Sequence, residues 1–202
     1  MRVAVIDSGV FIRHPHIIAS QVMGGVSFGP ADASYVDALG HGTAVMAAIQ
    51  EKAPHAEYYA LRVFHSALRT RVEHLLEALE WCIVNKIDIA NLSLGTANPA
   101  HAPRFEEFLK RAGSLAIVAA ASALPGSLVG VIGVELDPDC DRSTYRYNPA
   151  TGLFAASGYP RPIPGVPPEN NLQGISFAVA NMTGFAAALD TESVRSALVA
   201  QS

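Results

Sequence analysis

Residues 172–189, LQGISFAVANMTGFAAAL, are the stretch from which the fold is best judged, because a serine stands at the entry to an apolar segment. Gly174 precedes Ser176 in a Gly-x-Ser turn, and small or apolar residues then recur at the three- and four-residue spacing of an α-helix. A hydroxyl group at a helix N-terminus lies near unpaired N–H groups and the positive end of the helix dipole, which stabilise a developing anion. Gly-x-Ser before a helix is also a common N-cap. The segment alone therefore leaves a nucleophile and a cap as alternatives.

The composition indicates an ordinary globular protein. Half of the 202 residues are apolar and 16% are charged, which predicts one domain over residues 1–202 with a buried core. The formal charge of −4 and the lack of a basic run give no indication of a nucleic-acid or membrane partner. No apolar run approaches the roughly 20 residues of a membrane-spanning helix.

The cysteines and the N-terminus bear on the cellular compartment. Cys82 and Cys140 provide no disulfide framework and favour two free thiols, with one bridge as the alternative. The chain enters an apolar strand pattern at once and shows no signal peptide. We therefore expect a cytoplasmic protein, provided that Met1 is the native start.

Short apolar runs alternate with helical patterns along the chain. The expected strands cover residues 2–6, 57–64, 87–95, 115–121, 128–134 and 152–156. The expected helices cover residues 71–86, capped by Thr70, and 103–111, with others after His41, from Ser176 and after residue 189. Residues 20–40 and 137–171 are expected to be mostly irregular. This alternation predicts an α/β fold with a largely parallel sheet and helices on both faces.

Two further polar residues stand at the ends of expected elements. Asp7 closes the first strand, at the sheet edge where ligands gather in open α/β folds, although a turn or cap role is the alternative. His41 lies between two glycines before a helix, which leaves room for a neighbouring chain or substrate; a capping or surface role is the alternative. His14-Pro-His16 has no further ligand close in sequence, so we predict no metal site.

Three segments together carry a family resemblance: VAVIDSGV at 3–10, GHGT at 40–43 and GISFA at 174–178. Their order of Asp, His and Ser resembles that of the subtilisin-like serine peptidases, or subtilases. The segment NLSLG at 91–95 is similar to the family's substrate-binding strand, and AAAS at 119–122 to the strand before its oxyanion residue. The resemblance covers nearly the whole chain and implies the subtilisin-like three-layer fold.

The resemblance also implies an activity. Asp7, His41 and Ser176 would form the catalytic triad of a serine endopeptidase that acts through an acyl-enzyme, with no cofactor. The Ser176 N–H would be one oxyanion donor. A peptide or protein substrate would pair with the backbone of Ser93, Leu94 and Gly95. Small residues at 93–95 and 119–126 are expected to leave space for the side chain before the scissile bond, without a predicted preference.

The chain departs from the family pattern at the oxyanion hole. Ala123 stands where the family has an asparagine, so the second donor would be Ser122 or another residue such as Asn148. The lack of a signal peptide, a pro-segment and a calcium-binding loop suggests an intracellular enzyme that processes a specific peptide precursor, which is compatible with a biosynthetic or maturation complex. The alternative is a catalytically weak or inactive pseudo-peptidase that serves as a peptide-binding or scaffold subunit.

Overall fold

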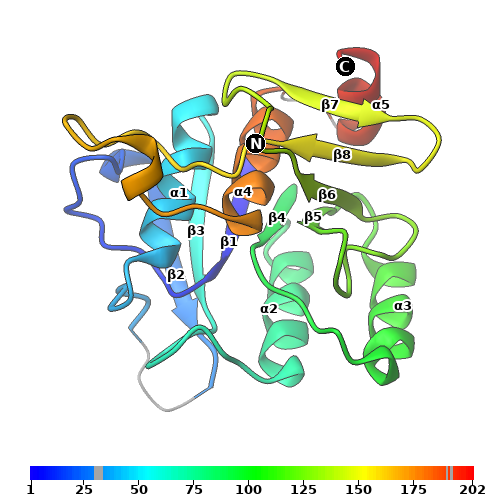
Figure 1. Cartoon of the computed structure of the whole chain (residues 1–202). Helices are drawn as coiled ribbons and strands as arrows, with labels where there is room; N and C mark the ends of the chain where they lie inside the picture. Colours follow the sequence, from blue (N-terminus) through cyan, green and yellow to red (C-terminus); the bar gives the residue numbers. More distant parts are fainter. Residues whose placement is uncertain (30–33, 190, 192) are drawn as a thin grey trace.

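A single eight-stranded sheet forms the centre of the computed structural model, which describes residues 1–29, 34–189, 191 and 193–202 (Figure 1). The strands are β1 (Arg2–Asp7), β2 (Val22–Ser27), β3 (Glu57–Arg62), β4 (Ile89–Leu92), β5 (Ala116–Ala120), β6 (Ile132–Leu136), β7 (Tyr145–Asn148) and β8 (Leu153–Ala156). Their order is β2-β3-β1-β4-β5-β6-β8-β7. Neighbouring strands run parallel except for β7, which is antiparallel to β8.

Helices cover both faces of the sheet. On one face lie α1 (His41–Lys52), α4 (Ile175–Ala188) and α5 (Val194–Ala200), and on the other lie α2 (Val72–Val84) and α3 (Ala102–Arg111). Three 3-10 turns span Ala19–Gln21, Pro99–His101 and Pro168–Asn170. Figure 1 shows α1 and α4 packed side by side. The three-layer, largely parallel α/β fold predicted from the sequence is confirmed.

The strand sequences explain why two layers of helices are needed. Side chains alternate between the two faces of a strand, and in β1 Val3 and Val5 pack against α1 and α4 while Ala4 and Ile6 pack against α2 and α3. All four are at most 1% exposed. A strand buried on both faces has no need of polar alternation, which is why β1 appears in the sequence as a continuous apolar run.

Several element predictions were wrong in detail. The region 20–40, expected to be irregular, contains β2. Within residues 137–171 the strand expected at 152–156 is confirmed as β8, whereas β7 was not expected. The strand expected at 128–134 begins only at Ile132. Helix α2 has Arg71 at its N-cap, whereas Thr70 Oγ1 lies 3.3 Å from His74 Nδ1. Strand β2 was missed because its glycines are not typical of a strand. A Cβ on Gly25 would lie 2.3 Å from the Ala60 carbonyl oxygen of β3, so the close pairing of these strands requires glycine at this position.

Two smaller expectations can also be compared with the structure. Cys82 and Cys140 are both free and buried, as predicted. Of the helices in the described part of the chain, none combines the length and apolar character that crossing a bilayer requires.

Candidate active site

The three residues singled out in the sequence lie at the ends of three different elements. Asp7 is the last residue of β1, His41 the first residue of α1, and Ser176 belongs to the first turn of α4. The His41 ring lies 5.8 Å, centroid to centroid, from the ring of Phe177, the residue that follows Ser176. The fold thus brings together residues that are separated by 34 and more positions in the chain.

Asp7 and His41 form a hydrogen-bonded pair in which Asp7 is buried and His41 is partly buried. His41 Nδ1 lies 2.8 Å from Asp7 Oδ1, which also accepts a 2.7 Å bond from the Ser8 N–H. Asp7 is 0% exposed, and its Oδ2 is buried with no hydrogen-bond partner among the described residues. A buried carboxylate needs a compensating charge or donor, so this pair favours a His41 that carries a proton on Nδ1. Nε2 is then the nitrogen that can exchange protons.

The environment of His41 shifts its pKa upward. Burial lowers the pKa of the imidazole, but the hydrogen bond and charge of Asp7, aided by the charge of Asp37, outweigh it. The pKa of His41 therefore lies above its ordinary value of 6.5. A histidine of this kind is a stronger base than free imidazole, which suits it to accept a proton from a hydroxyl group.

Glycines with unusual backbone angles precede both helices of the site. Gly40 and Gly174, at the N-caps of α1 and α4, have φ values of +82° and +137°. Side chains other than hydrogen rarely tolerate φ in this range, so glycine allows the sharp turn by which each chain enters its helix. His41 and Ser176 are consequently presented in the first helical turns, where backbone N–H groups have no partner within the helix.

Asp37 is a supporting residue that the sequence interpretation missed. Its carboxylate accepts bonds of 2.9 Å from the Leu39 and Gly40 N–H groups, 2.8 Å from the Thr43 N–H and 2.6 Å from the Thr43 hydroxyl. These bonds fix the segment that leads into His41. An aspartate shortly before a helix is a known capping signal, and it could have been recognised on that basis.

Ser176 is hydrogen-bonded to Ser93, the residue that follows β4. Its Oγ donates a 3.3 Å hydrogen bond to the Ser93 carbonyl, and Ser93 Oγ donates a 3.2 Å bond to the Ser176 carbonyl. Ser176 itself is partly exposed. This reciprocal contact places the expected substrate-binding segment directly beside the expected nucleophile.

A buried polar link supports Ser93 from behind. Asn91 of β4 is 0% exposed; its Nδ2 donates to Ser93 Oγ at 3.0 Å and its Oδ1 accepts from Thr183 Oγ1 of α4 at 2.9 Å. Buried polar groups are nearly always hydrogen-bonded, and this pair ties β4 to α4. The signal in the sequence was one asparagine within the apolar run that became β4, and its role depended on contacts across the fold.

The two candidates for a second oxyanion donor lie in different places. Ser122 is exposed in the turn that follows β5. Asn148 lies in β7, at the far edge of the sheet, and its Oδ1 accepts a 3.0 Å bond from the Ala150 N–H within its own hairpin. The fold therefore does not bring Asn148 to Ser176.

The space expected beside residues 93–95 is closed at Gly95. Thr96 and Leu124 exchange two backbone hydrogen bonds of 3.0 Å, one in each direction. A Cβ on Gly95 would lie 2.7 Å from the Leu124 carbonyl oxygen and 2.8 Å from Ala123 Cβ. The lack of a side chain at Gly95 thus lets two backbones meet, and the expected room for a substrate side chain elsewhere beside residues 93–95 and 119–126 stays a prediction.

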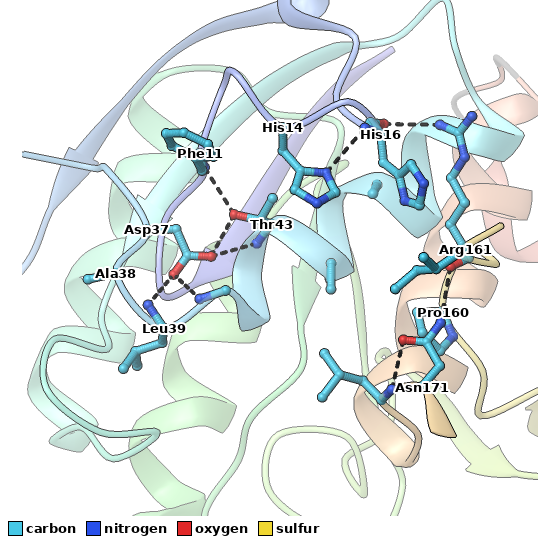
Figure 2. A pocket seen from close by; sticks show the side chains of 15 residues that line it. Phe11, His14, His16, Asp37, Ala38, Leu39, Thr43, Pro160, Arg161 and Asn171 are labelled. Atoms are coloured by element: carbon cyan, nitrogen blue, oxygen red, sulfur yellow. Dashed lines mark hydrogen bonds between the residues drawn. The ribbon is translucent and has the colours of Figure 1, made fainter. Parts of the chain in front are cut away.

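An open pocket lies on the other side of the site (Figure 2). It has a volume of about 510 Å³ and lies between the segment before His41 and the segment that leads to Ser176. Its lining residues are Phe11, His14, His16, Asp37, Ala38, Leu39, Gly40, Thr43, Ala44, Ala47, Pro160, Arg161, Ile163, Asn171 and Leu172. The described residues contain no group of three or more His, Cys, Asp or Glu side chains arranged to hold a metal ion.

Sequence comparison identifies the class of protein. Residues 1–132 match the sequence model of the Subtilase family, so this chain belongs to that family of serine peptidases. It is 35% identical over 133 residues to subtilisin E of Bacillus subtilis (strain 168), an alignment that covers 61% of this chain and 34% of the relative. It is 29% identical over 198 residues to an alkaline protease of Alkalihalobacillus alcalophilus, an alignment that covers 92% of this chain and 50% of the relative. The matched region is about a third to a half of the length of these relatives.

Solved structures support the fold. A cold-adapted subtilisin-like serine proteinase superposes with a TM-score of 0.71 at 21% identity, covering 92% of this chain and 73% of that one. The prenylagaramide maturation protease PagA superposes with a TM-score of 0.67 at 23% identity, covering 94% of this chain and 74% of PagA. At these identities the likeness establishes a shared architecture.

Proposed function

We propose that residues 1–202 form one peptidase domain that hydrolyses peptide bonds through Asp7, His41 and Ser176. The observation that carries the proposal is the 2.8 Å pair of buried Asp7 and His41 at the start of α1, beside the helix turn that holds Ser176. A carboxylate that orients a histidine next to a serine at a helix N-terminus is the arrangement used for acyl transfer. Membership of the subtilase family supports the same chemistry.

The proposed reaction has two halves. Ser176 Oγ attacks the peptide carbonyl carbon while His41 Nε2 takes the hydroxyl proton, and the carbonyl oxygen becomes an oxyanion. The C–N bond then breaks, His41 gives its proton to the leaving amine, and an acyl ester remains on Ser176. Water attacks the ester, again losing a proton to His41, and the acid product leaves as Ser176 regains its proton. Asp7 stabilises the imidazolium formed in each half.

The oxyanion would be stabilised at the start of α4. The Ser176 N–H and the helix dipole supply one donor and a favourable field, and we propose the exposed Ser122 as the second donor. If Ser122 fails to reach the oxyanion, the rate would fall by roughly 10²–10³, the cost of one missing donor. Ser176 Oγ must also exchange its bond to the Ser93 carbonyl for one to His41 as the substrate enters.

We propose a peptide precursor as the substrate. The structural neighbour PagA is described as a maturation protease, and this chain shares its architecture over 94% of its length. We also propose that the close packing of Gly95 against Leu124 and Ala123 restricts the side chain before the scissile bond, which favours a restricted set of substrates over general digestion. Action within a biosynthetic or maturation complex is compatible with this reading.

Labelling with a fluorophosphonate probe tests the proposal without knowledge of the substrate. Such a probe reacts with a serine that a neighbouring base has activated. We expect wild-type protein to be labelled, Ser176→Ala and His41→Ala to remain unlabelled, and the exposed Ser114→Ala to match wild type. Labelling that survives Ser176→Ala would contradict the assignment of the nucleophile.

A second candidate is a peptide-binding or scaffold subunit that hardly turns over. It is favoured by Ala123 at the oxyanion position and by the Ser176 hydroxyl bond to Ser93. This candidate predicts a folded wild-type protein that binds peptides but takes no fluorophosphonate label. The same labelling experiment therefore decides between the two.

A further inference from the structure

We propose that the pocket of Figure 2 binds the part of the substrate that follows the scissile bond, and that it selects an apolar side chain with a carboxylate next to it. This inference rests on the proposed function for the direction in which the substrate lies. The pocket itself is defined by the structure.

The chemistry fixes which end of the substrate meets the pocket. His41 must give its proton to the leaving amine, so the residues after the scissile bond lie on the His41 side of Ser176. Residues 38–40, which lead into His41, and Leu172, four positions before Ser176, both line the pocket. Ser93 touches Ser176 but does not line the pocket. The leaving segment therefore passes directly into it.

The rim of the pocket is apolar and exposed. Phe11 is 47% exposed, Leu39 37%, Ile163 43% and Leu172 51%. These side chains come from three distant parts of the chain and gather around one cavity. Exposed large apolar residues that cluster in this way mark a binding surface, because burying them against a ligand removes apolar area from water. An apolar side chain of the substrate is the partner that this rim fits.

The polar groups in the pocket favour a negative charge. Arg161, one of the residues that line the pocket, donates a 3.0 Å bond from Nη1 to the His16 carbonyl, which fixes the guanidinium beside His16 (Figure 2). His14 Nδ1 accepts a 3.1 Å bond from the His16 N–H, so the proton of the neutral His14 ring is on Nε2. Burial, Arg161 and His14 lower the pKa of His16, which leaves Arg161 as the principal charge. A guanidinium with neutral imidazole donors beside it suits a carboxylate.

The nearby carboxylates are already satisfied. Asp37 accepts four hydrogen bonds from the segment around His41. Glu51, whose charge reaches Arg161, is paired with Arg142. Asp37 keeps its charge, but its hydrogen bonds hold it at the N-terminal end of α1, where the helix dipole offsets part of that charge. Glu51 is held in its ion pair with Arg142, so Arg161 retains an attraction for an acidic ligand. The volume of about 510 Å³ lies within the range of small-ligand sites, on the order of 300–1,000 Å³, and is sufficient for two residues of a peptide.

Peptide binding to the Ser176→Ala protein tests the inference without catalysis. The probes are Leu-Glu-Gly-Gly, Leu-Lys-Gly-Gly and Gly-Glu-Gly-Gly, each with a free amine and a C-terminal dye, followed by fluorescence anisotropy. We expect Leu-Glu-Gly-Gly to bind at least about tenfold more tightly than the other two, since each lacks one of the two contacts. Equal binding of the three peptides would overturn the inference.

Matched variants locate the two contacts. In the Ser176→Ala background, Arg161→Gln is expected to abolish the preference for glutamate over lysine, whereas Arg69→Gln, an exposed arginine elsewhere, should leave it unchanged. Ile163→Ser is expected to weaken both leucine peptides several-fold, and the 99% exposed Val129→Ser should not. If Arg69→Gln acts like Arg161→Gln, the effect is a general charge effect and the site is refuted.

The outcome is separable from that of the proposed function. Fluorophosphonate labelling without any peptide preference would leave the peptidase standing and remove this pocket from its mechanism. A preference abolished by Arg161→Gln, in a protein that takes no label, would establish the pocket and favour the peptide-binding subunit.

Discussion

The two sides of Ser176 differ in how much room they offer. On the β4 side, Thr96 and Leu124 are paired and Gly95 lies against the backbone of Leu124, so the cleft is closed at that point. On the α1 side, a pocket of about 510 Å³ opens between the segments that lead to His41 and Ser176. We therefore expect only a small residue before the scissile bond and larger residues after it. Selectivity should therefore lie mainly with the leaving part of the substrate.

The largest expected effect comes from replacing Asp7, the carboxylate that orients His41. Asp7→Asn keeps the size of the side chain but favours the wrong His41 tautomer and withdraws the charge that stabilises the imidazolium. We expect kcat to fall roughly 10⁴-fold with little change in KM. Steady-state kinetics on any cleaved peptide checks this, and Asp139→Asn, an exposed aspartate, is the control. A loss of less than tenfold would mean that Asp7 is not part of the machinery.

The second-largest effect is expected from breaking the hydrogen-bonded link that Asn91 makes between β4 and α4. Asn91→Ala removes two hydrogen bonds, one with Thr183 Oγ1 and one with Ser93 Oγ, at a net cost of about 0.5–1.5 kcal/mol each in the free energy of unfolding. Because Ser93 would lose its support, kcat should also decrease, whereas the exposed Asn170→Ala should change neither quantity. Urea denaturation and kinetics measure the two effects. Unchanged kcat in a destabilised protein would show that Asn91 supports the fold alone.

The closed side can be tested by making it more crowded. In Gly95→Ala the added methyl group would meet Leu124 and Ala123 at less than 3 Å, so we expect a loss of about 1–3 kcal/mol in unfolding free energy from overpacking. Binding of Leu-Glu-Gly-Gly on the open side should be preserved. A stability equal to that of wild type would mean that the gap beside Gly95 is open in solution.

The smallest expected effect is a shift in pH dependence. The base must be unprotonated to accept the serine proton, so kcat/KM should rise with pH through the pKa of His41, which lies above 6.5. The pH–rate profile should therefore reach half of its maximum above pH 6.5. In Asp7→Asn, which lacks the main interaction that raises this pKa, the midpoint should move to lower pH. A wild-type midpoint below 6.5 would contradict the proposed pairing.

The sequence was sufficient to predict the fold and to single out the three residues proposed as the triad, and the reason is local. Asp7, His41 and Ser176 each stand in a short motif at the end of an element whose hydrophobic pattern is plain. Strands buried on both faces, such as β1, are short continuous apolar runs, and their length and β-branched residues distinguish them from buried helix segments. The order of these elements along the chain then places the three residues close together in the fold.

The features that were missed depend on contacts between distant segments. Pairing of Thr96 with Leu124 closes the space beside Gly95, and composition alone had suggested that small residues would leave it open. The pocket is assembled from residues 11–16, 37–47 and 160–172, and no pattern in the sequence indicated that these three segments meet. Periodicity describes single elements, whereas cavities arise from how turns and loops meet after folding.

Mapping cleavage sites in an unbiased peptide library by mass spectrometry tests the account most directly, because one experiment reports on both sides of Ser176. The account predicts cleavage after glycine or alanine, with an apolar residue and then an acidic residue following the cut. Arg161→Gln should lose only the acidic preference. Cleavage after large side chains, with no preference on the leaving side, would contradict the account.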